Sequence, residues 1–514
     1  MKLHDPLYTR RSGVLLHPTS LPGPWYQGDF SHNAFRFVEF LAAAGQTVWQ
    51  VLPLGPTHSD GSPYQCLSTH AGNPLLISLD WMVDRGWLEP GIWAGCAQTP
   101  QWRLEVLERG CINALADLDE AVRADFDQFV LGQAFWLDDY ANYIVLKKIH
   151  QGASWIDWPS PLRRHNEEAI KKALAGSETE LTLRKFEQYL FFTQWRELRN
   201  YAHQHGVYIF GDLPIFVSGD SADVWSKRRF FTIDDEGNGD VVAGVPPDAF
   251  TAEGQRWGNP LYNWDVLKAD KFTWWIDRLR THFSIYDLVR IDHFRGLESY
   301  WEIPASSPTA MDGHWVKAPG ADLLSRVQEK FSEMSLVAED LGIITSAVDD
   351  LRRQFSLPGM KVLQFAFDGD SGNHHLPHNH SADMIVYTGT HDNDTTLSWY
   401  QLADDATRDR VRRYLECSDN DMPWPLIRSA MMSSAQTAIF PMQDLLSLGT
   451  GHRMNTPGTV EGNWNWRFDW HQVESALAAR MQELTARYSR LSDGQPIQSF
   501  QAESSWHTLD QRKA

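Results

Sequence analysis

The chain has 514 residues, of which 42% are hydrophobic, and its formal net charge is −20. The length allows either one oversized barrel or several domains around a large core. A protein that neutralises phosphate groups needs the opposite charge. The composition therefore argues against nucleic acid and against anionic membrane surfaces as partners.

The four cysteines stand far apart, at positions 66, 96, 111 and 417. Their spacing fits neither a metal site nor a redox pair, and it indicates no disulfide framework. Residues 1–6 contain no apolar signal segment, and no apolar run approaches the length of a membrane span. We therefore expect a reduced, soluble protein of the cytoplasm.

Eight short apolar runs predict the strands of the fold. Most are continuously apolar rather than alternating, which is typical of strands buried on both faces of a parallel sheet. The runs cover residues 13–16, 47–52, 207–212, 286–292, 335–339, 360–365, 384–388 and 437–441.

Helical patterns lie between these runs. The first stops at Gly45, a C-cap signal, and the fourth starts with Thr345 as its expected cap. Alternating strands and helices imply an α/β fold, and eight repeats predict a closed (β/α)₈ TIM barrel. The predicted helices cover residues 33–44, 183–203, 272–282, 345–355 and 473–491.

The longest gap, residues 53–206, separates the second and third runs. Within it, residues 114–127, 131–148 and 167–174 have helical patterns. We interpret residues 75–180 as a mostly helical subdomain, inserted after strand two of a single catalytic barrel that spans residues 1–514. Long insertions on the catalytic side of a barrel commonly shape the substrate groove.

Three acidic residues follow predicted strands: Asp292, Glu339 and Asp392. A carboxylate where a buried parallel strand ends is badly placed for stability, but it is well placed for chemistry because barrel enzymes build their sites at that end. Two of the three can serve as nucleophile and proton donor in glycosidic bond cleavage. Asp212, at the end of the third run, is a fourth acid at the same rim.

The neighbours of these acids favour different roles for them. Strand alternation puts Arg290 on the same side as Asp292, where it keeps the carboxylate ionised; the alternative is a purely structural ion pair. Glu339 follows an apolar strand, so its pKa should be raised as a general acid requires. The alternative for this segment is a charge at a helix N-terminus, which suits Asp340 better than Glu339.

His391 and Asp392 together can hydrogen-bond adjacent sugar hydroxyls, and such bonds can strengthen in the transition state. The alternative is a polar turn. The histidine-rich segment 373–380 has the composition of a metal tract, but it lacks a nearby cysteine and a helical zinc motif, so we expect no metal there.

Short motifs surround these acids in a fixed order. They are residues 12–24, 62–65, 71–74, 211–214, 244–248, 254–260, 455–458 and 463–467. Through these motifs the chain resembles the amylomaltases, which are 4-α-glucanotransferases of the α-amylase clan, over nearly its whole length. The resemblance implies a (β/α)₈ barrel with inserted subdomains, in agreement with the eight runs.

The resemblance also implies roles for particular residues. Asp292 matches the nucleophile, Glu339 the general acid/base, and Asp392 the acid that holds the hydroxyls of the donor sugar. Arg290 and His391 match residues that support the nucleophile and the sugar. Further positions that match substrate contacts are Asp212, Tyr64, Asp248, Gln255, Trp257 and Asn463. No cofactor and no metal are implied.

The implied activity is transfer of α-1,4-glucan segments between maltooligosaccharides or starch by a retaining double displacement, with release of glucose or short maltooligosaccharides. Residues 244–260 are a candidate lid that excludes water. The close alternative is a cytoplasmic α-1,4-glucan hydrolase with the same acids, and a distant one is a non-catalytic glucan-binding protein. The sequence leaves open whether the protein is a monomer or a homodimer.

The chain departs from the family pattern in one turn. Members often carry a tyrosine in a Gly-Tyr-Gly-Asp turn, whereas residues 57–61 here read Thr57-His58-Ser59-Asp60-Gly61. Members with that tyrosine use it at a glucan site remote from catalysis, so we do not expect this remote site here.

Overall fold

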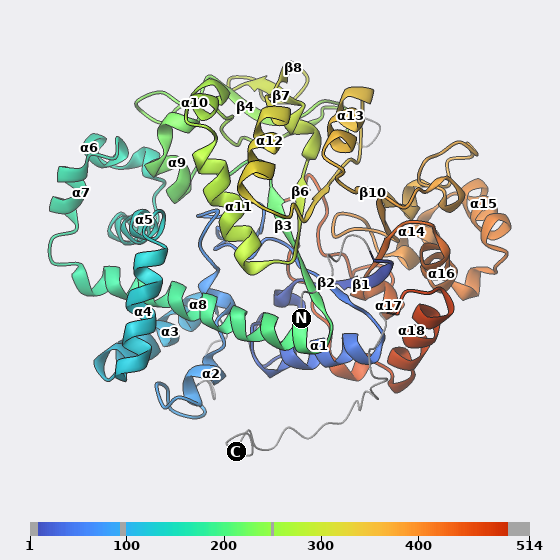
Figure 1. The fold of residues 1–514 in the computed structure, drawn as a ribbon, viewed down its shortest axis with the longest axis horizontal. Helices are drawn as coiled ribbons and strands as arrows, with labels where there is room; N and C mark the ends of the chain where they lie inside the picture. Colours follow the sequence, from blue (N-terminus) through green and yellow to red (C-terminus); the bar gives the residue numbers. More distant parts are fainter. Residues whose placement is uncertain (1–8, 93–98, 248–250, 492–514) are drawn as a thin grey trace.

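Eight parallel strands form the centre of the molecule, in the spatial order β10-β11-β12-β1-β2-β3-β6-β9 (Figure 1). The computed structural model describes residues 9–92, 99–247 and 251–491. Each of the eight predicted runs is a strand of this sheet. The strands are β1 (Arg11–Leu15), β2 (Val48–Gln50), β3 (Tyr208–Pro214), β6 (Leu288–Asp292), β9 (Leu336–Ala338), β10 (Gly359–Val362), β11 (Met384–Tyr387) and β12 (Thr437–Pro441).

The sheet closes into a barrel between its two end strands, β9 and β10. The backbone N–H of Ala338 donates to the carbonyl of Pro358 at 2.8 Å across this seam. The strands are buried along almost their whole length, which explains why their sequences are continuously apolar. The predicted (β/α)₈ barrel is therefore confirmed.

Five of the helices that pack around the barrel lie at or near the predicted positions 33–44, 183–203, 272–282, 345–355 and 473–491. Thr345 lies at the N-cap of α13 as predicted, but its side chain makes no capping hydrogen bond. The helices outside the large insertion are α1 (His32–Ala43), α8 (Glu178–Gln204), α9 (Ala222–Ser226), α10 (Trp264–Ala269), α11 (Thr273–Ile285), α12 (Gly320–Lys330), α13 (Ser346–Gln354), α14 (Thr396–Leu402), α15 (Asp405–Leu415), α16 (Trp424–Met432), α17 (Met442–Leu445) and α18 (Ser475–Arg487).

The segment between β2 and β3 is helical, and its helices gather on one side of the barrel (Figure 1). The predicted helix 114–127 is wrong in its bounds, because two helices, α3 and α4, meet within this range. Asp119 caps the second of them by accepting the N–H of Val122 at 2.9 Å. The helices are α2 (Leu79–Val83), α3 (Pro100–Ala116), α4 (Glu120–Gly132), α5 (Leu137–Ile149), α6 (Ser160–Arg163) and α7 (Glu167–Ala173).

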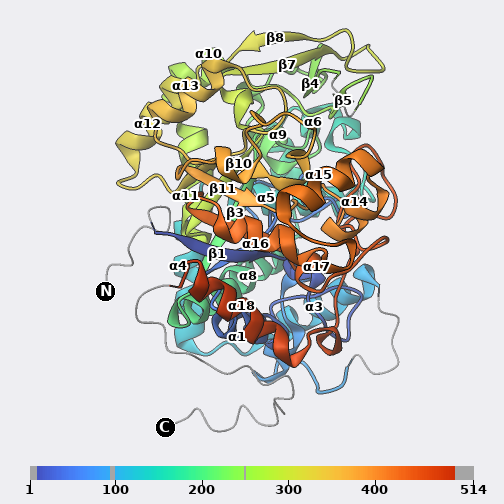
Figure 2. The ribbon, with the colours of Figure 1, turned by 90° about the vertical axis from the view of Figure 1, so that its right-hand side faces the viewer.

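A second sheet, antiparallel and four-stranded, lies beyond one end of the barrel (Figures 1 and 2). Its order is β5-β4-β7-β8, so a hairpin from residues 241–256 pairs with a hairpin from residues 299–317. The sequence pattern does not predict this sheet. Its strands are β4 (Val241–Val245), β5 (Gln255–Arg256), β7 (Ser299–Pro304) and β8 (His314–Lys317).

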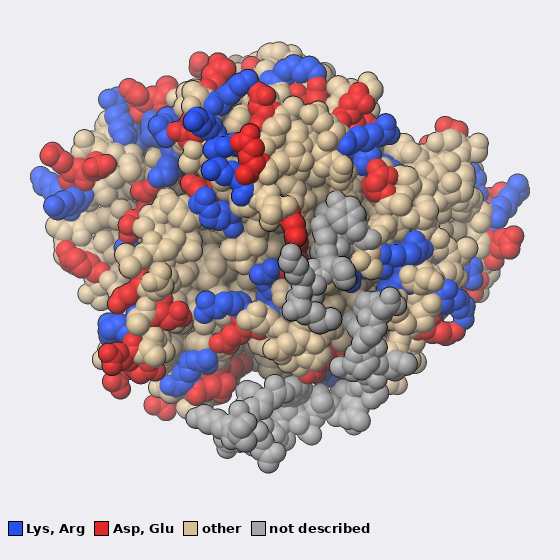
Figure 3. Space-filling view, viewed as in Figure 1, with Lys and Arg blue, Asp and Glu red and all other residues tan. Residues whose placement is uncertain are grey.

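The surface carries charges of both signs. On the face shown in Figure 3, basic and acidic side chains are interspersed around the rim rather than divided into two patches. Across the described ranges 9–92, 99–247 and 251–491, no helix is both long and apolar enough to cross a bilayer.

Candidate active site

The predicted acids meet at the carboxyl end of the barrel. Asp212 lies in β3, Asp292 is the last residue of β6, and Glu339 directly follows β9. Asp392 lies in the turn after β11. Because these strands are parallel, their carboxyl ends point the same way, and the charges of Asp212, Glu339 and Asp392 all act on Asp292.

Arg290 holds two of the acids at once. Its guanidinium donates to both carboxylate oxygens of Asp212, from Nε at 2.9 Å and from Nη2 at 2.8 Å. The same Nη2 donates to Oδ1 of Asp292 at 2.7 Å. Asp212 is completely buried, whereas the side chain of Asp292 is 30% exposed. The structural ion pair is therefore Arg290–Asp212, and Asp292 shares the arginine while facing open space.

Tyr64 joins this pair to the other side of the site. Its hydroxyl donates to Oδ2 of Asp212 at 2.7 Å, and its ring stacks on His391 with centroids 5.2 Å apart and an angle of 14°. Burial raises the pKa of Tyr64 well above its usual value, and the charge of Asp212 adds to that rise, so the phenol stays protonated. Tyr64 thus links Asp212 to the turn that carries Asp392.

Glu339 is fixed by backbone hydrogen bonds. The N–H of His293 donates to its Oε2 at 2.8 Å, and the N–H of Leu341 donates to its Oε1 at 2.8 Å. His293 follows Asp292 directly, so the carboxyl of Glu339 is tied to the backbone beside Asp292. Burial raises the pKa of Glu339 to about 7, against the opposing charge of Arg290.

Asp292 and Glu339 repel each other and titrate as a pair. Loss of solvent raises the pKa of Asp292 well above its usual value; Arg290 lowers it, and the neighbouring carboxylates raise it further. The guanidinium bonds directly to Asp292 and so favours its ionised form, whereas burial favours the protonated form of Glu339.

Asp392 is the most open of the acids, with its side chain 47% exposed. Asn455 donates from Nδ2 to its Oδ1 at 2.7 Å, and Nε2 of His391 lies 3.3 Å from the same oxygen. The sequence prediction omitted Asn455 as a site residue, although it begins the motif 455–458. Both of these contacts are made to the same carboxylate oxygen of Asp392.

The loop 455–464 closes on itself. Asn463 accepts the N–H of Thr456 at 2.9 Å and donates to the carbonyl of Thr459 at 2.9 Å. Asn463 is buried, so its amide braces this loop rather than pointing among the acids. Trp464, which has a positive φ of 64°, packs its ring against Tyr64 with centroids 5.9 Å apart.

The candidate lid 244–260 includes the end of β4 and the whole of β5 from the antiparallel sheet. Trp257 stands edge-on to His293, with ring centroids 4.9 Å apart and an angle of 86°. Gln255 accepts the indole N–H of Trp257 at 3.2 Å. Gly254 has a φ of +67°, and a Cβ there would lie 2.4 Å from the carbonyl of Val245, so this turn requires glycine. Asp248 lies outside the described residues.

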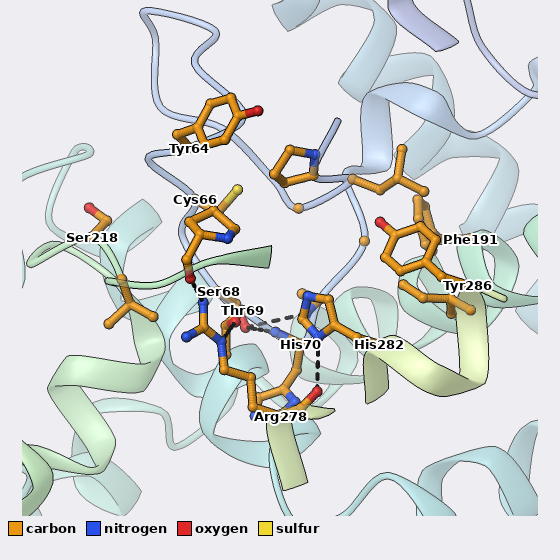
Figure 4. Close-up of a pocket in the computed structure, with 18 of the residues that line it drawn as sticks. Tyr64, Cys66, Ser68, Thr69, His70, Phe191, Ser218, Arg278, His282 and Tyr286 are labelled. Atoms are coloured by element: carbon orange, nitrogen blue, oxygen red, sulfur yellow. Dashed lines mark hydrogen bonds between the residues drawn. The ribbon is translucent and has the colours of Figure 1, made fainter. Parts of the chain in front are cut away.

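A small cleft of about 40 Å³ is lined in part by Tyr64 (Figure 4). Arg278, from α11, is buried at one end of it and donates from Nε to the hydroxyl of Thr69 at 2.6 Å and from Nη1 to the carbonyl of Ile215 at 3.0 Å. These bonds connect the loop after Tyr64 to the chain that leaves β3. The cleft therefore borders the site without containing any of its acids.

The histidine-rich segment is used for packing. His375 accepts the backbone N–H of Val362 at 3.1 Å, and His380 lies 2.6 Å from the hydroxyl of Ser433. Among the residues that the structure describes, no three His, Cys, Asp or Glu side chains are grouped to hold a metal ion. These histidines tie β10 and the following loop to the rest of the barrel.

An eight-stranded parallel barrel with ionisable groups at its carboxyl end has the architecture of a barrel enzyme. Residues 16–473 match the sequence profile of glycoside hydrolase family 77, described as 4-alpha-glucanotransferase. The 4-alpha-glucanotransferase of Thermus thermophilus is 46% identical over 496 residues, which cover 94% of this chain and 99% of the relative. That of Synechocystis sp. is 45% identical over 495 residues, which cover 94% and 98%.

Solved structures agree with the sequence comparison. The amylomaltase from Streptococcus agalactiae in complex with acarbose superposes with a TM-score of 0.90 at 36% identity, covering 94% of this chain and 100% of that chain. The chain therefore belongs to glycoside hydrolase family 77, the 4-alpha-glucanotransferase family. The predicted transferase activity is supported, and these relatives give no support to the hydrolase alternative.

Proposed function

We propose that the protein transfers α-1,4-glucan segments by a retaining double displacement in which Asp292 is the nucleophile and Glu339 the general acid/base. The observation that carries this proposal is the hydrogen bond from the N–H of His293 to Glu339, because it holds the acid against the residue that follows the nucleophile. Two carboxyl groups with different protonation states are what a retaining mechanism needs.

In the first half-reaction, Asp292 attacks the anomeric carbon while Glu339 gives its proton to the leaving glycosidic oxygen. A carboxylate–sugar bond forms, the glycosidic bond breaks, and the leaving glucan departs with the proton. Arg290 keeps Asp292 ionised before the attack, and its second carboxylate partner, Asp212, holds the guanidinium in place.

In the second half-reaction, the 4-hydroxyl of an acceptor glucan takes the place of the departed chain. Glu339, now ionised, removes the hydroxyl proton as the acceptor oxygen attacks the same carbon and Asp292 leaves. Two displacements on one carbon retain its configuration, so an α-1,4 bond is made from an α-1,4 bond. The enzyme returns to its starting protonation state.

Asp392 grips the donor sugar in this proposal. Asn455 and His391 occupy one of its carboxylate oxygens, and this leaves the other free to accept bonds from two neighbouring sugar hydroxyls. Such bonds shorten as the ring flattens toward the transition state, so they lower the barrier rather than only improve binding. The stack of Tyr64 on His391 keeps this turn close to Asp212.

Transfer instead of hydrolysis requires that the acceptor outcompete water. The hairpin 244–260 is the proposed lid, and the contact of Trp257 with His293 brings an apolar ring beside the reacting pair. A ring at this position covers the sugar and removes water from the space that the acceptor enters. Gln255 and Asp248, both within residues 244–260 of the sequence, are the proposed acceptor contacts.

The proposed substrates are α-1,4-glucans and maltooligosaccharides, as donors and as acceptors. The family supports this choice, and so does the acarbose complex of the streptococcal amylomaltase. We further propose that residues 1–514 act as one catalytic barrel in the cytoplasm, with residues 75–180 as an insertion that borders the substrate groove.

Incubation with maltotriose tests this proposal. A transferase yields glucose together with a ladder of longer maltooligosaccharides, whereas a hydrolase yields only glucose and maltose. Asp292→Asn and Glu339→Gln variants, run in parallel, should lose both product sets. Formation of glucose and maltose alone by the unaltered protein would refute the transferase mechanism.

A further inference from the structure

The seam of the barrel, between β9 and β10, is closed in an unusual way. The two strands lie at opposite ends of the sheet order, and Ala338 N–H to Pro358 is the backbone bond that joins them. Two residues after Pro358, the N–H of Met360 donates to Oδ1 of Asp340 at 2.6 Å. A side-chain carboxylate thus takes the place that a backbone carbonyl of β9 would have in a regular ladder.

The fit around this carboxylate is tight. Asp340 is buried, and a Cβ on Gly359 would lie 2.4 Å from its Oδ2. Even an alanine at position 359 would therefore push the carboxylate away from the N–H of Met360. The glycine is needed here for close approach and not for its backbone angles.

A buried arginine braces Asp340 from outside the barrel. Nε of Arg352, on α13, lies 3.6 Å from Oδ2 of Asp340. The guanidinium is itself held by the carbonyl of Leu357 at 2.8 Å and by the carboxylates of Asp349 and Asp383 at 3.2 and 3.0 Å. The alternative interpretation of Asp340, a charge at a helix N-terminus, does not apply, because α13 begins only at Ser346.

Glu339 is held on its other side by β6. Its N–H donates to the carbonyl of Ile291 at 3.1 Å, and its carbonyl accepts the N–H of Phe294 at 3.1 Å. With Asp340 fixed to β10, the backbone of Glu339 is clamped between the strand that carries Asp292 and the strand across the seam. A shift of Asp340 therefore moves the carboxyl of Glu339 relative to Asp292.

We propose that Asp340 is a positioning residue for the general acid: its carboxylate stands in for a backbone carbonyl of β9 at the seam and so fixes the place of Glu339 beside Asp292. This inference rests on the proposed role of Glu339. Asp340 acts on Glu339 in two ways that mutation can separate. The position of Glu339 depends on the bond from Met360 to Asp340, whereas the negative charge of Asp340 affects the pKa of Glu339.

The negative charge of Asp340 raises the pKa of Glu339. It is one of the groups that raise the pKa of Glu339, after burial, which is the main cause. A neutral group at position 340 therefore lets Glu339 give up its proton at a lower pH. Activity that needs the protonated acid is then lost earlier as the pH rises.

Two substitutions separate place from charge. Asp340→Asn keeps an oxygen that accepts from Met360 and removes the charge. Gly359→Ala keeps the charge and displaces the carboxylate. Asp349→Asn is the matched control, since Asp349 bonds the same arginine without touching the seam. Melting temperatures of all three variants identify any that are merely unfolded.

The readout compares two donors by kcat/KM, which reports only the first half-reaction. Maltotriose needs a proton on its leaving oxygen, whereas α-maltotriosyl fluoride releases fluoride ion without one as the bond to Asp292 forms. Weakening of a general acid costs up to about 10²–10⁴-fold on the first donor and far less on the second. We expect Gly359→Ala to lose about 10- to 100-fold on maltotriose and under about threefold on the fluoride.

Asp340→Asn should keep most of its maltotriose activity at acidic pH, with the alkaline limb of the pH profile displaced to lower pH. Asp349→Asn should keep the profile and the donor ratio of the unaltered enzyme. Equal losses on both donors in Gly359→Ala, or an unmoved alkaline limb in Asp340→Asn, would overturn the inference. Asp340→Asn preserves the bond across the seam, so its pH profile tests the inference even if Gly359→Ala does not fold.

Glu339→Gln separates this inference from the proposed function. If that variant lost activity equally on both donors, the role of Glu339 itself would be wrong. If it showed the selective loss while the Asp340 and Gly359 variants behaved as the unaltered enzyme, only the positioning role would fail.

Discussion

Trp257 and His293 meet edge to face, with ring centroids 4.9 Å apart, although they directly follow strands of two different sheets. His293 follows Asp292 and holds Glu339 through its backbone N–H. The indole of the proposed lid is thus one residue away from the proposed nucleophile. Its removal should affect the fate of the glycosyl-enzyme more than its formation.

We expect Trp257→Ala to raise the share of hydrolysis several-fold, because water enters the space that the ring covered. Transfer conserves the number of reducing ends and hydrolysis adds to it, so the rise in reducing ends during a maltotriose incubation measures that share. Trp257→Phe, which keeps an aromatic ring, should lie close to the unaltered enzyme. If the share of hydrolysis in Trp257→Ala equalled that of the unaltered enzyme, the proposed lid would not be the cause of transfer.

Asp292→Asn should lower kcat by at least about 10⁴-fold, since nucleophile and general acid act as a unit. The asparagine keeps the size of the side chain and a partner for Arg290, so the fold and glucan binding should persist. Binding of maltooligosaccharides by calorimetry, beside the activity assay, checks both points. Unchanged turnover in this variant would favour the non-catalytic glucan-binding alternative.

The pH dependence should show an alkaline limb near neutrality. Burial raises the pKa of Glu339 to about 7, so the protonated acid needed for the first half-reaction is present below that pH and is lost as the pH rises through it. The profile of kcat/KM for maltotriose from about pH 5 to about pH 9 measures this. Fluoride release from α-maltotriosyl fluoride should lack that limb, and a shared limb would point to another group.

Asn455→Ala should reduce kcat more than it raises KM. The amide orients Asp392 by donating to its Oδ1 at 2.7 Å, and the oriented carboxylate acts mainly in the transition state. We expect a loss of about 10- to 100-fold in kcat. Asn455→Asp should be worse, because it faces Asp392 with a second negative charge. A rise in KM alone would mean that Asp392 binds the ground state and transition state equally.

Tyr64→Phe should lower kcat by about tenfold, the effect of losing one positioning hydrogen bond to Asp212. The ring remains and can still stack on His391, so Tyr64→Leu should lose clearly more. Initial rates of both variants with maltotriose give the comparison. Equal losses of kcat in the two variants would show that the ring contributes nothing beyond the hydroxyl.

Some of this site follows directly from the sequence. Asp212 and Asp292 end continuously apolar runs, and the parallel barrel that such runs build brings strand ends together. Arg290 could be assigned to the same side as Asp292 because side chains alternate along a strand. The helix boundary at Asp119 was also accessible, since an aspartate before a helical pattern is a capping signal.

Other parts depend on contacts between distant segments. Asp340 bonds Met360 across the seam, and Asn455 reaches Asp392 from another loop, so neither pairing leaves a local pattern. The antiparallel sheet escaped prediction for the same reason: β4 pairs with β7, which lies far along the chain, and β5 has only two residues. Short strands without periodicity give no signal until their partners are known.

The antiparallel sheet also constrains how this enzyme can move. β7 starts at Ser299, soon after the turn that carries His293, and it pairs with β4 at the base of the proposed lid. The base of the hairpin and the loop that follows Asp292 are therefore connected through the pairing of β4 with β7. Any movement of the hairpin would therefore pull, through the pairing of β4 with β7, on the segment that follows Asp292.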